Sequence, residues 1–191
     1  MKASVRSAST PAHHHAVRFY ENDRSLAQIV AQFLNDGLAA GSPGIVVATA
    51  AQRAAIVREL GRSRDVVQLQ RSDDLVLLDA DDTLSMFMTN GMPDAARFQD
   101  SMCEVIGRAC RGREDCTVRI YGAMVDILWK NGKQHAAIRL EMLWNQLANT
   151  QSFSLLCGYA MGNFYKDANV QEVCRHHTHV VSADGKMSAV A

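Results

Sequence analysis

The sequence lacks an excess of charge of either sign. Lysine and arginine together number 20, as do aspartate and glutamate, so the formal net charge is zero. A domain that binds nucleic acid directly usually carries a basic surplus, and we therefore expect no direct nucleic-acid contact. No apolar run approaches the roughly 20 residues needed to cross a bilayer, and residues 1–15 lack the apolar core of a signal peptide. These absences favour a cytoplasmic chain that does not bind membranes.

The sequence also lacks the short motifs by which many metal and catalytic sites are identified. The five cysteines are odd in number and include no Cys-x-x-Cys pair. This argues against a disulfide framework or a cysteine zinc site and favours reduced thiols. No Gly-x-Ser-x-Gly or His-Glu-x-x-His pattern occurs. We therefore assign no catalytic residue, predict no cofactor and expect that the chain is not an enzyme.

What the sequence does have is a regular alternation of short apolar runs with longer amphipathic segments. Short apolar runs predict strands at 16–20, 44–49, 66–70, 75–80, 116–122 and 153–161, and the run at 44–49 is rich in β-branched residues. Apolar residues at three- and four-residue spacing predict helices at 23–41, 50–61, 81–91, 93–112, 123–132, 134–150 and 167–181. This alternation predicts an α/β fold of three αβα layers with a mainly parallel central sheet.

The same pattern predicts a single domain, because no linker or internal repeat divides it. We expect this domain at 13–181. A flexible N-terminal tail is expected at 1–12, which is rich in serine and alanine, and a C-terminal tail at 182–191.

Five segments carry a resemblance to a known family. They read "HAVRFYENDRSLAQIVAQFLNDGLAAGSPGIVVAT", "LVLLDADDTLSMFMTNGMPDAARF", "VRIYGAMVDILW", "AAIRLEMLWNQL" and "FSLLCGYAM". In this order and spacing, over residues 15 to 181, the chain resembles the MEDS domain, the methanogen/methylotroph DcmR-type sensory domain. The resemblance implies a core like that of the RecA/KaiC ATPases. It also implies a sensory role for small organic molecules, in a domain that occurs alone or fused to output modules.

The junction that would hold the phosphate loop of such an ATPase is degenerate. A phosphate loop needs glycines whose backbone N–H groups cradle the phosphates, followed by lysine and serine or threonine. This chain reads "FYENDRSL", with neither glycine nor lysine. Arg24 and Ser25 could replace the lysine and the hydroxyl, but Glu21 and Asp23 would repel phosphate. ATP hydrolysis is therefore not expected, although a degenerate nucleotide-binding protein stays as an alternative.

The crevice at the carboxyl ends of the predicted strands is the expected ligand site. Tyrosines and acids at these ends would suit a small organic molecule with apolar and hydrogen-bonding parts. The candidate residues come from these strand ends and from the degenerate phosphate-loop junction, and they are Tyr20, Glu21, Asp23, Arg24, Ser25, Asp79, Tyr121 and Tyr159. Equally, the tyrosines could cap the sheet and the acids could cap helices. A bound ligand would shift a conformational equilibrium that a partner signalling protein reads, or that controls self-association.

Histidines near the two ends of the chain form a third candidate site. If the first and last elements are neighbours, His15, His177 and His179 could ligate a transition metal in a metal-linked sensor. The alternative is that these histidines are structural and pair with acids.

Overall fold

The computed structural model describes residues 14–164 and 170–190. The expected tail at 1–12 and His13 lie outside the described residues. The strands are β1 (His15–Tyr20), β2 (Gly44–Ala48), β3 (Leu75–Asp79), β4 (Met88–Thr89), β5 (Met92–Pro93), β6 (Val118–Gly122), β7 (Phe153–Ala160), β8 (His179–Val181) and β9 (Met187–Ala189). The helices are α1 (Asp23–Ala39), α2 (Ala50–Leu60), α3 (Val66–Arg71), α4 (Ala80–Phe87), α5 (Ala95–Ala109), α6 (Met124–Lys130), α7 (Gln134–Leu147) and α8 (Val170–Cys174), with a 3₁₀ turn, η1 (Met161–Asn163).

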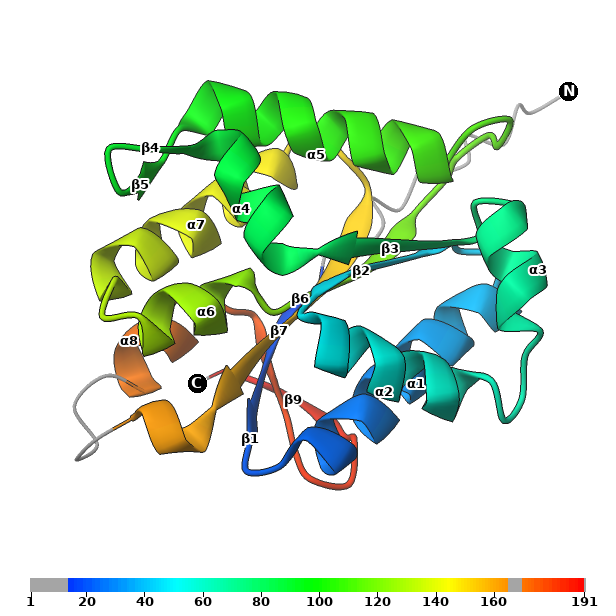
Figure 1. Ribbon diagram of the computed structural model, residues 1–191, viewed down its shortest axis with the longest axis horizontal. Helices are drawn as coiled ribbons and strands as arrows, with labels where there is room; N and C mark the ends of the chain where they lie inside the picture. Colours follow the sequence, from blue (N-terminus) through cyan, green and yellow to red (C-terminus); the bar gives the residue numbers. More distant parts are fainter. Residues whose placement is uncertain (1–13, 165–169, 191) are drawn as a thin grey trace, which may run out of the picture.

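The central sheet confirms the predicted α/β fold class. Its strand order is β3-β2-β6-β7-β1-β8-β9. Neighbouring strands are parallel except for β8 and β9, which form an antiparallel pair at the edge. Helices α1, α2 and α3 cover one face, and α4 to α7 cover the other (Figure 1).

Alternation of side chains along each strand produces two separate cores. In β1, Val17 packs into the core under α4 to α7, whereas Ala16 and Tyr20 pack into the core under α1 to α3. In β7, Cys157 and Leu156 divide in the same way. This two-residue period decides which functional side chains can meet, since residues of opposite parity lie on opposite sides of the sheet.

Two predicted elements differ from the structure, and local chemistry explains both. Residues 66–70 form helix α3, because the side chain of Asp65 accepts a hydrogen bond from the N–H of Gln68 and caps a first turn. The predicted helix at 81–91 ends at Phe87 and is followed by the β4–β5 hairpin. Asn90 and Gly91, both at positive φ, make its two-residue turn. Pro93 therefore lies in β5, not in the first turn of the next helix.

The C-terminal part of the chain also differs from expectation. The predicted helix at 167–181 is described only as α8, and His179–Val181 form β8, which pairs with β1. The β-branched residues at 180 and 181 favour this strand. Residues from 182 do not form a simple tail, since Met187–Ala189 return as β9.

The disulfide of the structure contradicts the prediction that all cysteines are reduced thiols. Cys110 follows α5 and Cys116 precedes β6, and their sulfur atoms are bonded across the connecting loop, with Cα atoms 5.6 Å apart. Cys103, Cys157 and Cys174 are free thiols.

No helix among the described residues is long and apolar enough to span a membrane.

Candidate functional site

A crevice lies at the carboxyl ends of the central strands, where parallel sheets commonly bind ligands. Its volume is about 350 Å³. The walls come from the segments that follow β1, β2, β6 and β7. Their polar members are Tyr20, Glu21, Asn22, Asp23, Thr49, Gln52, Asp126, Lys130 and Asn163.

Asp126, on α6, organises the floor of this crevice. Its side chain is 8% exposed. The Tyr20 hydroxyl donates to Oδ2 at 3.0 Å, and the N–H of Ala160 and the Asn163 amide donate to Oδ1 at 2.9 and 2.8 Å. Gln52 donates to the Tyr20 oxygen at 3.3 Å. Hydrogen bonds to a carboxylate are stronger than neutral ones, so this network fixes the ends of β1, α6 and β7 relative to one another.

The Tyr20 phenol keeps its proton at neutral pH. Burial, together with the negative charge of Asp126, raises the pKa of Tyr20 above its ordinary value. A protonated phenol stays a hydrogen-bond donor toward the Asp126 carboxylate. The floor therefore keeps one hydrogen-bonding arrangement over the physiological range.

The rim of the crevice is acidic and offers little to a phosphate. Asn22 caps α1, and its side chain accepts from the Ser25 N–H at 2.9 Å. The junction where a phosphate loop would lie is thus closed by a side-chain cap. Glu21 and Asp23 add exposed carboxylates, and Lys130 is the one basic residue of the described lining. This charge balance disfavours anions.

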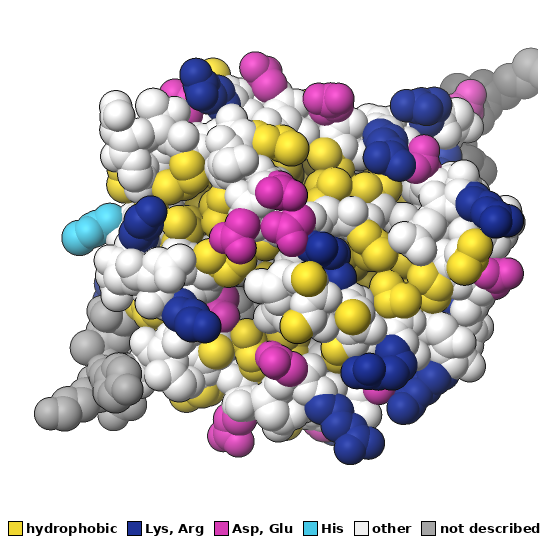
Figure 2. All heavy atoms as spheres, in the orientation of Figure 1, with side chains coloured by type: hydrophobic (Ala, Val, Ile, Leu, Met, Phe, Trp, Pro, Cys, Tyr) yellow, Lys and Arg dark blue, Asp and Glu magenta, His cyan; other side chains and the backbone are white. Residues whose placement is uncertain are grey.

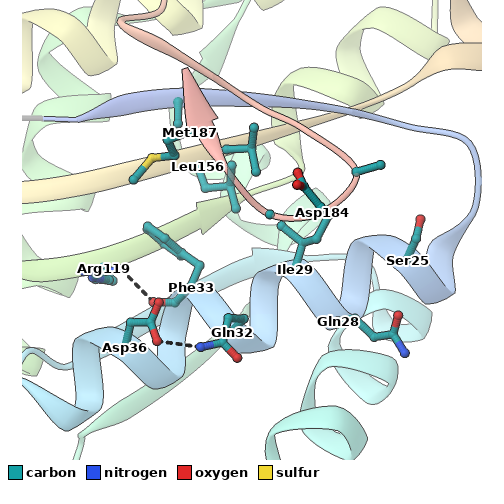
Figure 3. Close-up of a pocket in the computed structure, with 14 residues that line it drawn as sticks. Ser25, Gln28, Ile29, Gln32, Phe33, Asp36, Arg119, Leu156, Asp184 and Met187 are labelled. Atoms are coloured by element: carbon teal, nitrogen blue, oxygen red, sulfur yellow. Dashed lines mark hydrogen bonds between the residues drawn. The ribbon is translucent and has the colours of Figure 1, made fainter. Parts of the chain in front are cut away.

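The structure distributes the predicted loop residues over two cavities. Tyr20, Glu21 and Asp23 line the crevice, whereas Arg24 is exposed and lies outside its lining. Ser25 faces a different groove of about 300 Å³ between α1 and the β8–β9 hairpin (Figure 3).

The groove beside α1 is lined by apolar side chains and by polar side chains that contact neighbouring residues. Ile29 and Phe33 of α1 face Met187 of β9 across it. The Arg119 guanidinium lies 5.0 Å from the centre of the Phe33 ring and donates to the Phe33 carbonyl oxygen at 3.0 Å. The groove shares none of its lining residues with the crevice.

Asp79 does not lie at the crevice, so its predicted place there is wrong. It ends β3 at the edge of the sheet, accepts from the N–H groups of Asp81 and Asp82, and pairs with Arg53 at 2.7 Å. Asp79 caps helix α4, which is the structural role given above as the alternative to ligand binding. Acidic side chains gather at this place, at the start of α4, on the face shown in Figure 2.

The other two predicted tyrosines are buried on opposite sides of the sheet. Tyr121 is 0% exposed, and its ring packs against Gly158, where a Cβ atom would lie 2.7 Å from the phenol oxygen. Tyr159 is also 0% exposed and donates to Oε1 of Glu141 at 2.7 Å, under α7. Neither lines the crevice, because Tyr121 is buried in the core under α1 to α3 and Tyr159 in the core under α4 to α7.

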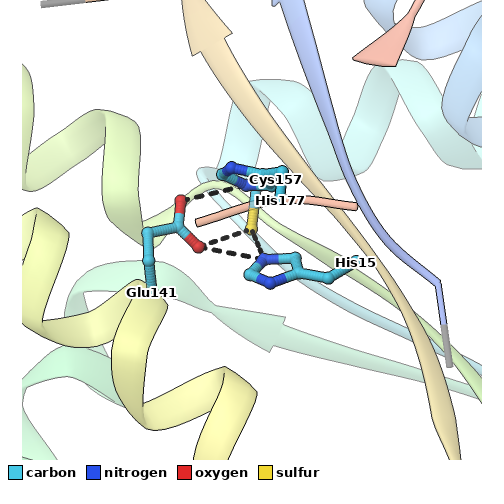
Figure 4. Close-up of side chains that lie close together, drawn as sticks. All are labelled: His15, Glu141, Cys157 and His177. Carbon is cyan, nitrogen blue, oxygen red and sulfur yellow. Dashed lines mark hydrogen bonds and ion pairs between the residues drawn. The ribbon is translucent and has the colours of Figure 1, made fainter. Parts of the chain in front are cut away.

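Of the three histidines predicted to meet, the structure brings two together. His15 and His177 meet with Glu141 and Cys157 in a buried cluster in which all four donor atoms lie within 4.8 Å of one another (Figure 4). His179 lies apart on β8, with its ring centre 4.9 Å from that of His14.

The Glu141 carboxylate is coupled to the other titratable groups of this buried cluster. Burial disfavours the charged carboxylate, but His177 and His15 outweigh that cost and hold the pKa of Glu141 well below its ordinary value. Burial also opposes the charged imidazole, but the Glu141 carboxylate raises the pKa of His177. Burial and Glu141 together raise the pKa of the Cys157 thiol. Glu141 and His177 thus favour each other's charged forms, and the Cys157 thiol is held in its neutral form.

Several residues of the two sites were not among the candidates chosen from the sequence, although the sequence carried a signal for some of them. Glu141 lies at the helical spacing of its apolar neighbours Ala137 and Trp144, so its position on the buried face was readable. Thr49 and Gln52 form a capping box, whose Thr-x-x-Gln pattern is recognisable. Nothing in the sequence indicated that Asp126 would accept hydrogen bonds from three different segments.

Comparison with known proteins agrees with the fold and identifies the family. A KaiC-like protein of the hyperthermophilic archaeon Pyrococcus horikoshii OT3 superposes with a TM-score of 0.56 at 14% sequence identity, over 87% of this chain and 70% of that one. That similarity confirms the RecA/KaiC-like core. None of the curated proteins compared with the chain matches it significantly. The family model of the MEthanogen/methylotroph, DcmR Sensory domain matches residues 14–178, and the chain therefore belongs to the MEDS family of sensory domains.

Proposed function

We propose that this sensory domain binds a small organic molecule in the crevice at the carboxyl ends of the strands and passes the signal on without catalysis. The observation that carries the proposal is the crevice itself, a cavity of about 350 Å³ with polar groups converging from four connections. Its size is at the lower end of the range typical of small-molecule sites. The sensory character of the family supports the same conclusion.

The lining favours a ligand that donates hydrogen bonds. Glu21 and Asp23 present carboxylates, which only accept, and Thr49 adds a hydroxyl. The donors of Tyr20, Gln52 and Asn163 are already directed at partners within the floor. A short alkylamine or alcohol would supply donors to these acceptors, and an amine would also balance the acidic rim.

A degenerate nucleotide-binding function is the second candidate, because the core resembles a KaiC-like protein. The chemistry of the junction disfavours it. Asn22 occupies the N–H of Ser25 that a phosphate loop would direct at a ligand, and the two flanking residues are acidic. The test below therefore includes ATP as the competing ligand.

Thermal-shift titration with short alkylamines, short alcohols, the matching carboxylates, and ATP with Mg²⁺ separates these functions. We expect saturable stabilisation by an amine or an alcohol, and none by the carboxylates or ATP. In the Ala160→Leu variant the added side chain enters the crevice, while the backbone N–H of residue 160 still bonds to Asp126. This variant should lose the stabilisation. The matched control is Ala183→Leu, in the groove beside α1, which should keep it. Stabilisation by ATP together with phosphate release would contradict the proposal.

We further propose that the output is protein–protein contact through the surface around the β4–β5 hairpin. Met86 and Met92 are 55% and 41% exposed there, and flexible thioether side chains suit an adaptable contact. Sedimentation velocity at increasing protein concentration tests self-association through this surface. Association that persists in a Met86→Glu and Met92→Glu double variant would contradict it.

A further inference from the structure

We propose that His15, Glu141, Cys157 and His177 form a buried four-coordinate site for a divalent transition metal, with zinc as the best match to the donor set. The donors are two imidazole nitrogens, one carboxylate oxygen and one thiolate sulfur, the ligand types that tetrahedral zinc sites use. This inference concerns a different cavity from the ligand crevice and does not depend on the proposed function.

The distances between donor atoms already approach those of a metal site. With metal–nitrogen and metal–oxygen bonds of about 2.0 Å and a metal–sulfur bond of about 2.3 Å, tetrahedral ligand atoms lie about 3.3–3.6 Å apart. Nε2 of His15 lies 3.0 Å from Oε2 of Glu141, and Nε2 of His177 lies 3.3 Å from Oε1. Sγ of Cys157 lies 3.5 Å from Nε2 of His15 and 3.4 Å from Oε2 of Glu141. The remaining separations involve Nε2 of His177 and stay within 4.8 Å, so a common centre requires His177 to move toward the other three ligands.

Outer hydrogen bonds direct both imidazoles into the cluster. Nδ1 of His15 lies 2.8 Å from Oδ1 of Asn145, an acceptor, and the amide nitrogen of Asn145 donates to the carbonyl oxygen of His176 at 2.9 Å. Nδ1 of His177 donates to the carbonyl oxygen of Val173 at 2.8 Å. Each imidazole therefore carries its hydrogen on Nδ1 and directs Nε2 inward, which is the arrangement that orients histidine ligands in metal sites.

The inward nitrogen of His177 supports the site independently of the distances. His177 is 6% exposed, and its Nε2 has no partner with hydrogen-bond geometry among the described residues. Buried polar atoms normally have such partners. The Tyr159 hydroxyl occupies Oε1 of Glu141 at 2.7 Å, which leaves Oε2 for coordination.

Charge balance is consistent with a divalent ion. A divalent ion with one carboxylate, one thiolate and two neutral imidazoles is neutral overall. Coordination requires the Cys157 thiol to lose its proton to solvent, and it involves no oxidation or reduction.

The position of the ligands indicates a structural role. They come from β1, α7, β7 and the segment after α8, so the ion would join two interior strands of the sheet to the helical layer (Figure 4). Four ligands from the protein leave no open position for a substrate. The ion would anchor the segment that continues into β8, which pairs with β1 over two residue pairs.

The test uses the full chain with any tag removed, stripped with chelator and then given Zn²⁺ alone or Co²⁺ alone. We expect one tightly held equivalent of metal per chain and release of protons on binding, measured by calorimetry in buffers of different ionisation enthalpy. Co²⁺ should give the intense visible bands of four-coordination and a near-ultraviolet thiolate charge-transfer band. Cys157→Ser should lose that band, and His177→Ala should weaken binding by more than about 100-fold. Tyr159→Phe, which removes only the outer hydrogen bond, should weaken it about 10–100-fold.

The matched control is His179→Ala, because His179 is only two residues from His177 but lies outside the cluster. This variant should keep the metal and the charge-transfer band. The proposal is overturned if the wild-type chain holds no stoichiometric metal, or if bound Co²⁺ gives no thiolate band. It is also overturned if metal is lost in the His179 variant but kept in the Cys157 and His177 variants, since surface histidines would then be the ligands. The band and the metal stoichiometry are measured on the wild-type chain, so they decide the matter even if a cluster variant fails to fold.

Discussion

Removing the hydroxyl group of Tyr159 should destabilise the fold, whereas removing that of Tyr121 should not. Both side chains are 0% exposed, so Phe substitution deletes one buried oxygen in each. The Tyr159 hydroxyl donates to the charged Glu141 at 2.7 Å, and loss of such a bond costs about 1.5–3 kcal/mol. The Tyr121 hydroxyl has no hydrogen-bond partner among the described residues, so its loss should leave stability unchanged or raise it by about 1 kcal/mol.

Urea unfolding followed by tryptophan fluorescence measures both effects. The experiment is done in chelator, so that metal does not contribute to the free energy of unfolding. Equal slopes with shifted midpoints would show that stability alone has changed. A loss in Tyr121→Phe as large as that in Tyr159→Phe would refute the reasoning, because packing would then outweigh the hydrogen bond at Glu141.

Three further perturbations test other parts of the structure. Gly158→Ala should lower the free energy of unfolding by about 1–3 kcal/mol in the same assay, because its Cβ would press on a buried tyrosine ring. In acid titration, the Asp79→Asn variant should lose less stability between about pH 5 and pH 3 than the wild-type chain. The hydrogen bond from Arg53 lowers the pKa of Asp79, so the ionised carboxylate stabilises the fold above its unfolded pKa, and this stability is lost as the pH falls through the folded pKa. The disulfide Cys110–Cys116 closes a short loop, and its reduction should lower the free energy of unfolding by about 2 kcal/mol. Urea unfolding measured with and without reductant tests this, and equal stabilities would show that the bond does not form.

The long elements were predictable from the sequence because their periodicity is strong. The strands at 44–48 and 153–160 are almost wholly buried runs, and α1 and α7 repeat apolar residues at helical spacing. Short elements were decided by single local contacts. The cap at Asp65 turned an alternating segment into a helix, and the turn at Asn90 and Gly91 was a recognisable hairpin signal that the helical periodicity of 81–91 obscured.

The sites depended on tertiary neighbours that the sequence does not specify. His15 and His177 meet only because β8 pairs with β1, so the sequence could suggest the pair but not its partners. Cys157 joins them because it lies on the same face of β7 as Tyr159. Residue parity could have separated Tyr121 from Tyr159, but only once the sheet order was known.

Chemical-shift mapping by NMR tests the central claim, ligand sensing in the crevice, most directly. The backbone amides are followed while the alkylamine or alcohol with the strongest thermal shift is titrated in. The account predicts saturable shifts centred on Ala123, Ala160 and Asn163, which line the crevice. Shifts centred instead on Gln32 and Asp184, in the groove beside α1, or no saturable shift with any of these compounds, would contradict it.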